Sequence, residues 1–241
     1  MSGTLYVSAA GGEARLAQLD VLANNLANSE TVGFRAGEVV FEAELDAALH
    51  DGEGAPEQGR AFVRVGEASV RGLSGPIRST GRELDVAIQG DGFFAVDTAG
   101  GERFTRAGSF QVDPSGILVS LSGDPVLGEG GAISVGSRPV RIEADGSILD
   151  DEDQLVDRLR VVRFADASAL VQEGGSRLRA SEADPGEPVE APQLALRSLE
   201  GSNVQPVQDL ARMIVVQRAF DAAMRTLESE DAASRRLLEE L

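Results

Sequence analysis

The chain has 241 residues and 42% hydrophobic content, which is enough for one large domain or two small ones. Its net charge of −18 repels phosphate groups, so we expect no nucleic-acid partner and no binding to an anionic membrane. Cysteine is absent and His50 is the one histidine, which excludes disulfides and argues against zinc sites and Ser-His-Asp triads.

The first predicted element is an N-terminal helix with a narrow apolar seam. Small and apolar residues recur there at spacings of four and three over three heptads, which is typical of a helix that pairs with another helix. The seam consists of Leu5, Ala9, Gly12, Leu16, Leu19, Ala23 and Leu26. A plain amphipathic helix packed on its own domain is the alternative. The chain opens without a basic region followed by an apolar run, so we expect no ordinary secretion signal.

Three asparagines, Asn24, Asn25 and Asn28, lie in the stretch LANNLANSETVGFRA (22–36). Asparagine is unfavourable inside a helix because its amide competes for backbone groups. Asn28 fits a helix that ends by Gly33, but Asn24 and Asn25 need another reason. An amide pair beside a seam can form hydrogen bonds between helices and fix their register. With Phe34 as an apolar anchor, the stretch is predicted to be an interface element.

The middle of the chain changes to a period of two, which indicates β-strands. LDVAI places Leu84, Val86 and Ile88 on one face, and RLRVVRF (158–164) is predicted as another strand. The similar segments DPSGIL (113–118) and ADGSIL (144–149) are predicted hairpin turns. Further alternating segments, turns and loops are GFFAV, SFQVD, GILVSL, QGDG (89–92), DTAGGE (97–102), SGDP (122–125), HDGEGAPEQG (50–59) and ASEADPGEPVEAPQ (180–193).

A second helix is predicted at the C-terminus. Ser202 and Gln205 fit a capping box, Pro206 fits the first turn, and Asp209 suits the positive end of the helix dipole. The seam of this helix, again at spacings of three and four, consists of Met213, Val216, Phe220, Ala223 and Leu227.

Two motifs suggest chemistry but fit a structural role better. GDGFFA (90–95) matches a dinucleotide-binding pattern, yet Asp91 would face the phosphates and a strand follows where a helix is needed. DDEDQLVD (150–157) is acidic, but the glycine and glutamate of a calcium loop are out of register. We therefore expect no bound metal, no cofactor, no small-molecule substrate and no catalytic residues.

These elements predict an α+β chain in which the N- and C-terminal helices pair as a coiled-coil-like domain beside a mainly-β central domain. The expected domains are a terminal helical assembly domain (1–36 and 200–241), an extended linker (37–80) and a β-rich centre (81–199). Net charge is −1 over residues 1–36 and −2 over residues 201–241, so the segment between them carries −15. Nearly neutral ends suit tight packing, and an acidic centre suits contact with water.

LANNLANSETVGFRA resembles the N-terminal signature of the flagellar rod and hook axial proteins, a pattern of the form ANNLANxxTxGF followed by Lys or Arg. Residues 79–128 and 199–229 are similar to that family's central segment and C-terminal helix, so the resemblance covers nearly the whole chain. Chain length and GSNVQPVQDLARMI favour one basal-body rod subunit. The distal rod subunit, which is typically longer, or another hook or rod protein is the alternative. Ser29 and Glu30 depart from the common signature, which bears on the subtype.

The resemblance implies a structural subunit of the periplasmic basal-body rod that is exported by the flagellar type III system. It also implies helical self-assembly around an export channel, with other rod and hook subunits as partners. A soluble enzyme or ligand-binding β-domain is the distant alternative. The predicted assembly residues are Leu16, Leu19, Asn24, Asn25, Leu26, Asn28, Gly33, Phe34, Ser202, Asn203, Met213, Val216, Phe220 and Leu227.

Overall fold

A computed structural model of the chain describes residues 2–39, 41–45, 61–65, 69–136, 138–167, 170–181 and 184–239. His50 and the predicted loop 50–59 lie outside these residues. The chain divides into two compact units, each of which is described by itself. We call them the helical unit (Met1–Leu26, Glu38–Ala68 and Pro206–Leu241) and the β-rich unit (Ala27–Gly37 and Ser69–Gln205).

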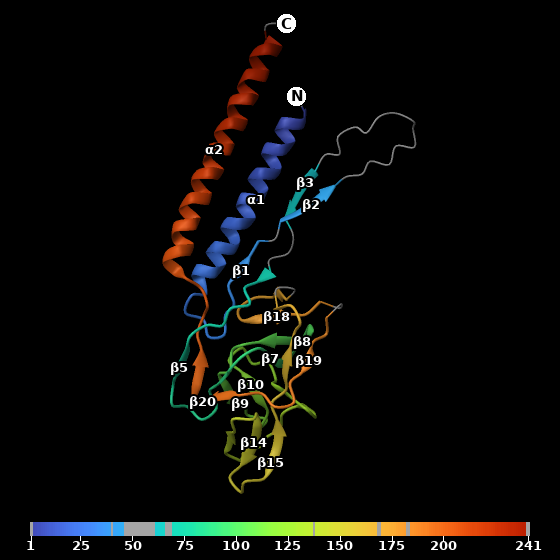
Figure 1. Cartoon of the computed structure of the whole chain (residues 1–241), viewed down its shortest axis with the longest axis vertical. Helices are drawn as coiled ribbons and strands as arrows, with labels where there is room; N and C mark the ends of the chain where they lie inside the picture. Colours follow the sequence, from blue (N-terminus) through green and yellow to red (C-terminus); the bar gives the residue numbers. More distant parts are fainter. Residues whose placement is uncertain are drawn as a thin grey trace, which may run out of the picture. The chain divides into compact units, whose positions relative to one another are not determined.

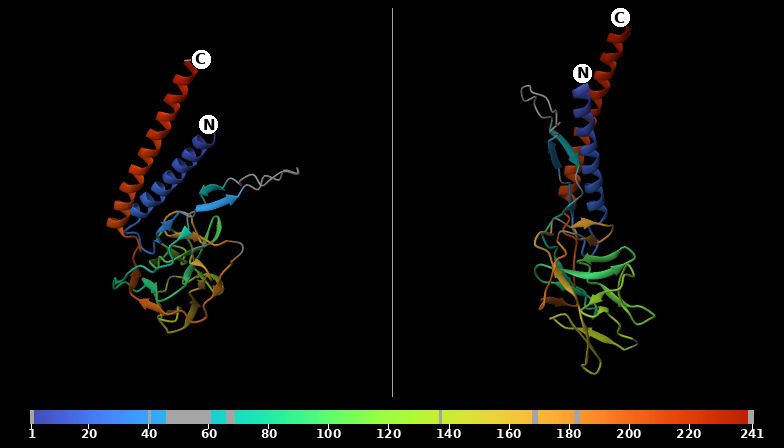
Figure 2. Two further views of the ribbon diagram at one scale, coloured as in Figure 1. Left: turned by 45° about the horizontal axis from the view of Figure 1, so that its top comes forward. Right: turned by 90° about the vertical axis from the view of Figure 1, so that its right-hand side faces the viewer.

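The helical unit contains the two long helices of the chain, α1 (Ser2–Ala27) and α2 (Pro206–Glu239). The two run in opposite directions and lie next to each other in Figures 1 and 2. The unit also contains an antiparallel hairpin of β2 (Phe41–Leu45) and β3 (Ala61–Val65). The prediction of an α+β chain with a helix at each end is confirmed, whereas coiled-coil pairing of the helices stays a prediction. Among the described residues, no helix has the length and hydropathy to cross a membrane.

The β-rich unit is built around a sheet that has eight strands among the described residues. In spatial order these are β1 (Gly37–Glu38), β4 (Ser69–Val70), β17 (Val171–Gln172), β18 (Arg177–Arg179), β8 (Gly101–Thr105), β7 (Phe93–Thr98), β16 (Val161–Arg163) and β19 (Glu187–Pro188).

Smaller sheets complete the β-rich unit, and their strands pair in antiparallel fashion. They are β9 (Phe110–Val112) with β10 (Leu118–Ser120), β11 (Leu127–Gly128) with β12 (Gly131–Ala132), β13 (Val140–Ile142) with β14 (Ser147–Asp150) and β15 (Leu155–Arg158), β6 (Val86–Ile88) with β20 (Leu194–Leu196), and β5 (Ile77–Ser79) with β21 (Ser198–Glu200).

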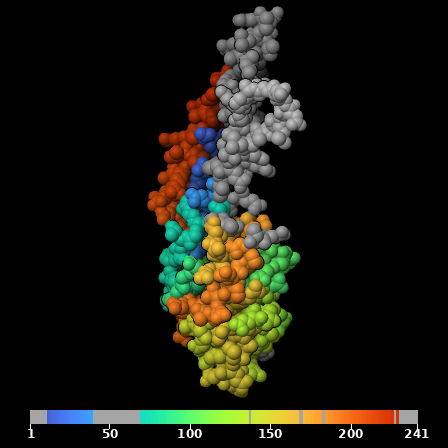
Figure 3. Space-filling model, turned by 45° about the vertical axis from the view of Figure 1, so that its right-hand side comes forward, coloured from blue at the N-terminus to red at the C-terminus, as the bar shows by residue number. Residues whose placement is uncertain are grey.

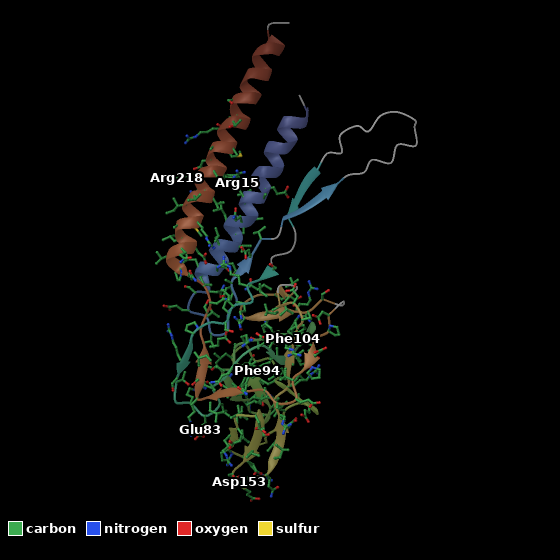
Figure 4. All side chains as sticks on the ribbon, viewed as in Figure 1. Arg15, Glu83, Phe94, Phe104, Asp153 and Arg218 are labelled. Atoms are coloured by element: carbon green, nitrogen blue, oxygen red, sulfur yellow. The ribbon has the colours of Figure 1, made fainter. Side chains whose placement is uncertain are left out.

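Strand β7 separates two hydrophobic cores because its alternating side chains are apolar on both faces. Phe94 and Val96 belong to one core, and Phe93 and Ala95 belong to the other. Phe94 meets Phe110 edge to face, with ring centroids 5.2 Å apart. The labelled Phe94 and Phe104 lie inside the unit in Figure 4. Because these four residues alternate between the two cores, the segment GFFAV is buried on both faces of the sheet.

The predicted hairpin turns are confirmed. DPSG connects β9 to β10, and the Asp113 carboxylate accepts hydrogen bonds from the backbone N–H groups of Ser115 and Ile117. Residues 143–146 connect β13 to β14 in the same way, and the Asp145 carboxylate accepts a hydrogen bond from Ser147 N–H. A strand follows GDGFFA, as expected of a turn and not of a dinucleotide loop.

The prediction of a single strand over 158–164 is wrong, because β15 ends at Arg158 and β16 starts at Val161. Leu159 and Arg160 between them bond to other parts of the unit: Leu159 N–H donates to Gly146 and Arg160 N–H donates to Leu127. The segment RLRVVRF is continuous in sequence, but β15, which ends at its first residue, and β16 within it belong to different sheets.

Candidate assembly site

The predicted seam of α2 corresponds to the inner face of this helix. Val216 is 9% exposed, and Met213, Phe220 and Ala223 are half-buried, while most other described side chains along the helix are exposed. A β-carbon placed on Gly12 of α1 would lie 3.8 Å from the Phe220 ring, so the two helices are in contact there. The side chain of Leu227 lies outside the described residues.

The outer side of α2 is also apolar, although it is exposed in this chain. Val207 is 83% exposed and Val215 is 66% exposed, and the residues directly before and after each of them are uncharged. The remaining exposed apolar residues of α2 are Leu210, Ile214 and Met224. We call these five residues the outer face of α2.

The inner face of α1 differs from the predicted seam. Leu22 and Asn25 are buried, Leu19 and Leu26 are half-buried, and Leu16 is 47% exposed. The predicted seam omitted Leu22 and included Leu16, so the true face is rotated around the helix. Apolar and small residues in α1 satisfy the three-four spacing in more than one phase, so the sequence could not select between them.

The three asparagines occupy different environments. Asn25 is 1% exposed, whereas Asn24 is exposed. Asn28 lies beyond the last helical residue, Ala27, and its side-chain oxygen accepts a hydrogen bond of 3.1 Å from the Thr31 hydroxyl. Neighbouring helical residues point about 100° apart, so the two amides face different surroundings, and their role in helix register stays a prediction.

Gly33 does not end the helix, which is a correction to the sequence prediction, since α1 stops at Ala27 and a turn follows. Instead, Gly33 adopts a φ of 67° and passes close to another segment of the β-rich unit. A β-carbon there would be 2.1 Å from the backbone nitrogen of Ala107. Glycine is required both for the positive φ and for this approach.

A buried cluster of Arg35, Arg106 and Glu200 follows directly. One carboxylate oxygen of Glu200 lies 3.0 Å from Arg35 and the other lies 3.1 Å from Arg106, and all three side chains are 2% exposed. Gly75 N–H donates to Glu200 at 2.8 Å. We call these three charged residues the arginine–glutamate cluster. It joins the segment after α1 to the segment before α2.

Both guanidinium groups are destabilised by burial, and Glu200 offsets only part of this effect. Desolvation lowers the pKa of Arg106 to about 10 and lowers the pKa of Arg35, while the charge of Glu200 acts in the opposite direction. Arg106 also donates to the Gly90 carbonyl at 2.8 Å and lies 5.0 Å from the Phe93 ring centroid. Without Glu200, two like charges would face each other in an apolar environment.

Asn203 forms a second link in the same region. Its side-chain oxygen accepts a 2.6 Å hydrogen bond from Ala36 N–H, and its side-chain nitrogen donates to the Leu73 carbonyl at 2.7 Å. Arg35 also donates to the Leu73 carbonyl. The three segments 33–36, 71–75 and 200–204 are thereby held together within the β-rich unit.

Phe34 and Ser202 also contact their own chain. Phe34 is 1% exposed and packs with Ala36 and Val204. Ser202 is not a helix cap, which corrects the capping-box prediction: α2 begins at Pro206, and the Ser202 hydroxyl accepts a hydrogen bond from Val204 N–H. Contacts of Phe34, Ser202 or Asn203 with a neighbouring subunit stay predictions.

Sequence reasoning missed the roles of Arg35, Arg106 and Glu200. Arg35 lies in the N-terminal stretch 22–36, but Arg106 and Glu200 lie 71 and 165 residues further along the chain. One signal was available in the sequence. Arg35 places a charge directly after Phe34, the predicted apolar anchor, and a purely apolar interface would not contain a charge there. Asp209 in the first turn of α2 was correctly expected; it is fully buried, with Arg212 at 3.5 Å.

The described residues contain no group of three or more carboxylate or imidazole side chains that could hold a metal ion. The buried carboxylates have structural partners instead. Asp85, for example, accepts hydrogen bonds from Thr80 at 2.7 Å and from Ser109 at 3.1 Å. The geometry therefore supports a scaffold that fixes two helix attachments, with apolar helix faces for binding.

Three family models match successive parts of the chain. Residues 5–35 match "Flagella basal body rod protein", residues 87–149 match "Flagellar hook protein FlgE/F/G D1 domain", and residues 197–240 match "Flagellar basal body rod FlgEFG protein C-terminal". The first and third of these regions contain Arg35 and Glu200, respectively.

Whole-length relatives carry related names. The flagellar basal-body rod protein FlgF of Caulobacter vibrioides is 35% identical, over 100% of this chain and 98% of the relative. FlgF of Mesorhizobium japonicum is 38% identical over 98% of both chains. The basal-body rod protein FlgG of Bacillus subtilis is 34% identical over 96% of both chains. FlgF is the rod subunit that chain length and the C-terminal segment favour, and FlgG is the alternative.

Proposed function

Because this chain belongs to the flagellar basal-body rod protein family, we propose that it is built into the rod through both faces of its terminal helices. The chain is a structural subunit of the bacterial flagellar basal-body rod, in the periplasm, and it is not an enzyme. Its partners are other rod and hook-family subunits, including further copies of itself, and it reaches the rod through the flagellar type III pathway.

The observation that carries this proposal is the two-sided apolar character of α2. Met213, Val216 and Phe220 face inward, while Val207 and Val215 on the outer face remain in water. A single helix partner covers one stripe of a helix, and exposed contiguous apolar residues mark interaction surfaces. Neighbouring subunits supply the missing burial.

The arginine–glutamate cluster supports the same function by a different route. Subunits in a regular assembly must hold their binding helices in one orientation. Glu200, Arg35 and Asn203 fix the points where the chain leaves for α1 and α2. We propose that Asn24 and Asn25 then contribute to helix register, and that the terminal helices form a coiled-coil-like assembly domain around the export channel.

A pair of matched substitutions tests the proposal. Val215→Asp introduces a charge on the outer face, and Gln111→Asp introduces the same charge at an exposed polar position of β9, away from both helices in sequence and in a different unit. We expect Val215→Asp to abolish motility and to leave basal bodies without complete rods in electron micrographs, while Gln111→Asp assembles normally. Purified chains of both variants should melt at the same temperature. Normal rods in the Val215→Asp strain would refute the use of the outer face.

A further inference from the structure

The β5–β21 ribbon is an unusual surface of this acidic chain. Residues 71–82 contain Arg71, Arg78 and Arg82 and no acidic residue, although the whole chain has a net charge of −18. β21 is preceded by Arg197, which is 61% exposed. The teal atoms of the segment that contains β5 are visible on the surface of the β-rich unit in Figure 3.

Arg78 lies in the middle of β5, and its backbone pairs with Leu199 of β21. Among the arginines that the structure describes in the β-rich unit, it alone has a side chain without a hydrogen bond or ion pair to another described residue. All three residues of β5 are exposed, and Ile77 is 44% exposed. Leu73, five residues before Arg78, is 75% exposed. The exposed strand β5 thus combines the apolar Ile77 with an unpaired cation, and the exposed Leu73 lies in the segment before it.

The backbone of β5 is open on one side. Gly201 donates to the Pro76 carbonyl and Thr80 donates to the Arg197 carbonyl, which places the groups of alternate residues toward β21. The N–H and C=O groups of Ile77 and Ser79 therefore point away from β21, and no hydrogen bond to them is present among the described residues. A strand edge of this kind can pair with another strand.

The edge at β19 of the large sheet is different. Val189 N–H donates to the Val161 carbonyl, so Pro188 occupies the outward position, and proline has no N–H to donate. Proline is a common means of keeping an edge from pairing. The chain therefore blocks one edge and leaves the edge at β5 open.

A complementary edge exists elsewhere on the same unit. β15 is the last strand of the β13–β14–β15 sheet, and its first residue, Leu155, is 62% exposed. The turn before it contains Asp151, Glu152 and Asp153. Asp153 pairs with Arg141, whereas the exposed side chain of Asp151 has no partner among the described residues. Figure 4 labels Asp153 in this turn and Glu83, which is near β5, at a separate place.

We propose that the β5 edge of one copy binds the acidic turn and β15 edge, residues 151–155, of a second copy. Arg78 forms an ion pair with Asp151, and Ile77 packs near Leu155. The outward N–H and C=O groups of β5 form backbone hydrogen bonds with the neighbouring edge. The two surfaces are different, so the contact is heterologous and repeats along an open assembly. This inference rests on the proposed function, since it requires copies that stand next to each other in the rod.

Disulfide mapping in isolated basal bodies tests the contact. The sequence contains no cysteine, so Ser79→Cys combined with Leu155→Cys provides the only two thiols of this chain. We expect mild oxidation to give a ladder of dimers, trimers and larger species. Ser79→Cys combined with Ser115→Cys, in the exposed β9–β10 turn, is the control and should stay monomeric.

Charge exchange gives a second measurement. Arg78→Glu and Asp151→Arg should each reduce the size of motility zones, and the double variant should restore it; Arg163→Glu, at an exposed arginine of β16, should have no comparable effect. Chains that are present in basal bodies but form no ladder, together with no rescue by the double variant, would overturn this contact alone. Absence of the unmodified chain from basal bodies would overturn the proposed function itself.

Discussion

The two units of this chain bury their side chains in opposite ways. The β-rich unit has two hydrophobic cores on either side of β7 and also buries charged residues that are paired with each other. The helical unit buries one narrow stripe on α2 and leaves Val207 and Val215 in water. One unit thus buries its apolar side chains within a single chain, whereas the other leaves apolar side chains exposed, as expected if neighbouring subunits cover them in the proposed assembly.

The buried polar groups strengthen this contrast. Within the β-rich unit, Glu200 and Asn203 bond to segments that are distant in sequence, and these bonds decide where the unit ends. The β-rich unit includes residues 27–37 and 200–205, of which residues 27–36 and 200–205 are predicted from sequence to belong to the terminal helical assembly domain. The following predictions test whether the two units differ in this way, from the largest expected effect to the smallest.

The largest effect should come from the choice of fragment. A fragment of residues 27–205 contains the whole β-rich unit, whereas a fragment of residues 81–199 lacks both Arg35 and Glu200 and leaves Arg106 buried without its partner. We expect the longer fragment to unfold cooperatively and to be more stable by at least about 3 kcal/mol. Chemical denaturation of both fragments measures this. Equal stability would mean that the segments after α1 and before α2 belong to the helical unit.

Glu200→Gln should be nearly as damaging within the full chain. Glutamine can still accept the hydrogen bond from Gly75, but it leaves the guanidinium groups of Arg35 and Arg106 without a counter-charge. We expect a loss of about 3–5 kcal/mol in the free energy of unfolding of the β-rich unit.

Glu187→Gln is the matched control for this substitution. Glu187 pairs with Arg163 at 3.3 Å but is 79% exposed, so its loss should cost less than about 1 kcal/mol. Urea denaturation followed by near-ultraviolet circular dichroism separates the two. Similar losses for Glu200→Gln and Glu187→Gln would contradict a special role of the buried cluster.

Gly33→Ala should have an intermediate effect. Gly33 and Gly123 both have positive φ, 67° and 84°, but a β-carbon meets backbone atoms only at Gly33. Both substitutions pay about 1–2 kcal/mol for the left-handed conformation, and Gly33→Ala adds about 1–3 kcal/mol for the clash with Ala107. Thermal melts of the two variants give the difference. If Gly123→Ala is equally destabilising, the close approach at Gly33 contributes nothing.

The smallest effect should appear in the helical unit. Val216→Ala removes buried methyl groups and should lower the stability of α2 by about 1 kcal/mol, whereas Val215→Ala on the outer face should change it by less than about 0.5 kcal/mol. The change in helix propensity is the same for both. Hydrogen exchange of α2 amides in the purified chain reports the difference. Equal effects would show that α2 has no preferred inner face in a single chain.

Local pattern by itself determined much of this protein. The three-four spacing of Met213, Val216 and Phe220 predicted the inner face of α2, and period-two alternation with Asp-Gly and Pro-Ser-Gly turns predicted the hairpins. The signature at 22–36 resembled the rod family, and the comparisons confirm that family. These features depend on residues that are close in sequence, so no tertiary contact is needed to recognise them.

Tertiary structure alone decided which residues are buried together. Arg35, Arg106 and Glu200 form one cluster although up to 165 residues separate them, and no local rule predicts a pairing at that distance. It also decided that Leu22 and not Leu16 lies on the inner face of α1, because several phases of small residues satisfy the same spacing. Gly33 was recognised as important, but its reason, the approach of Ala107 from another segment, exists only in the folded chain.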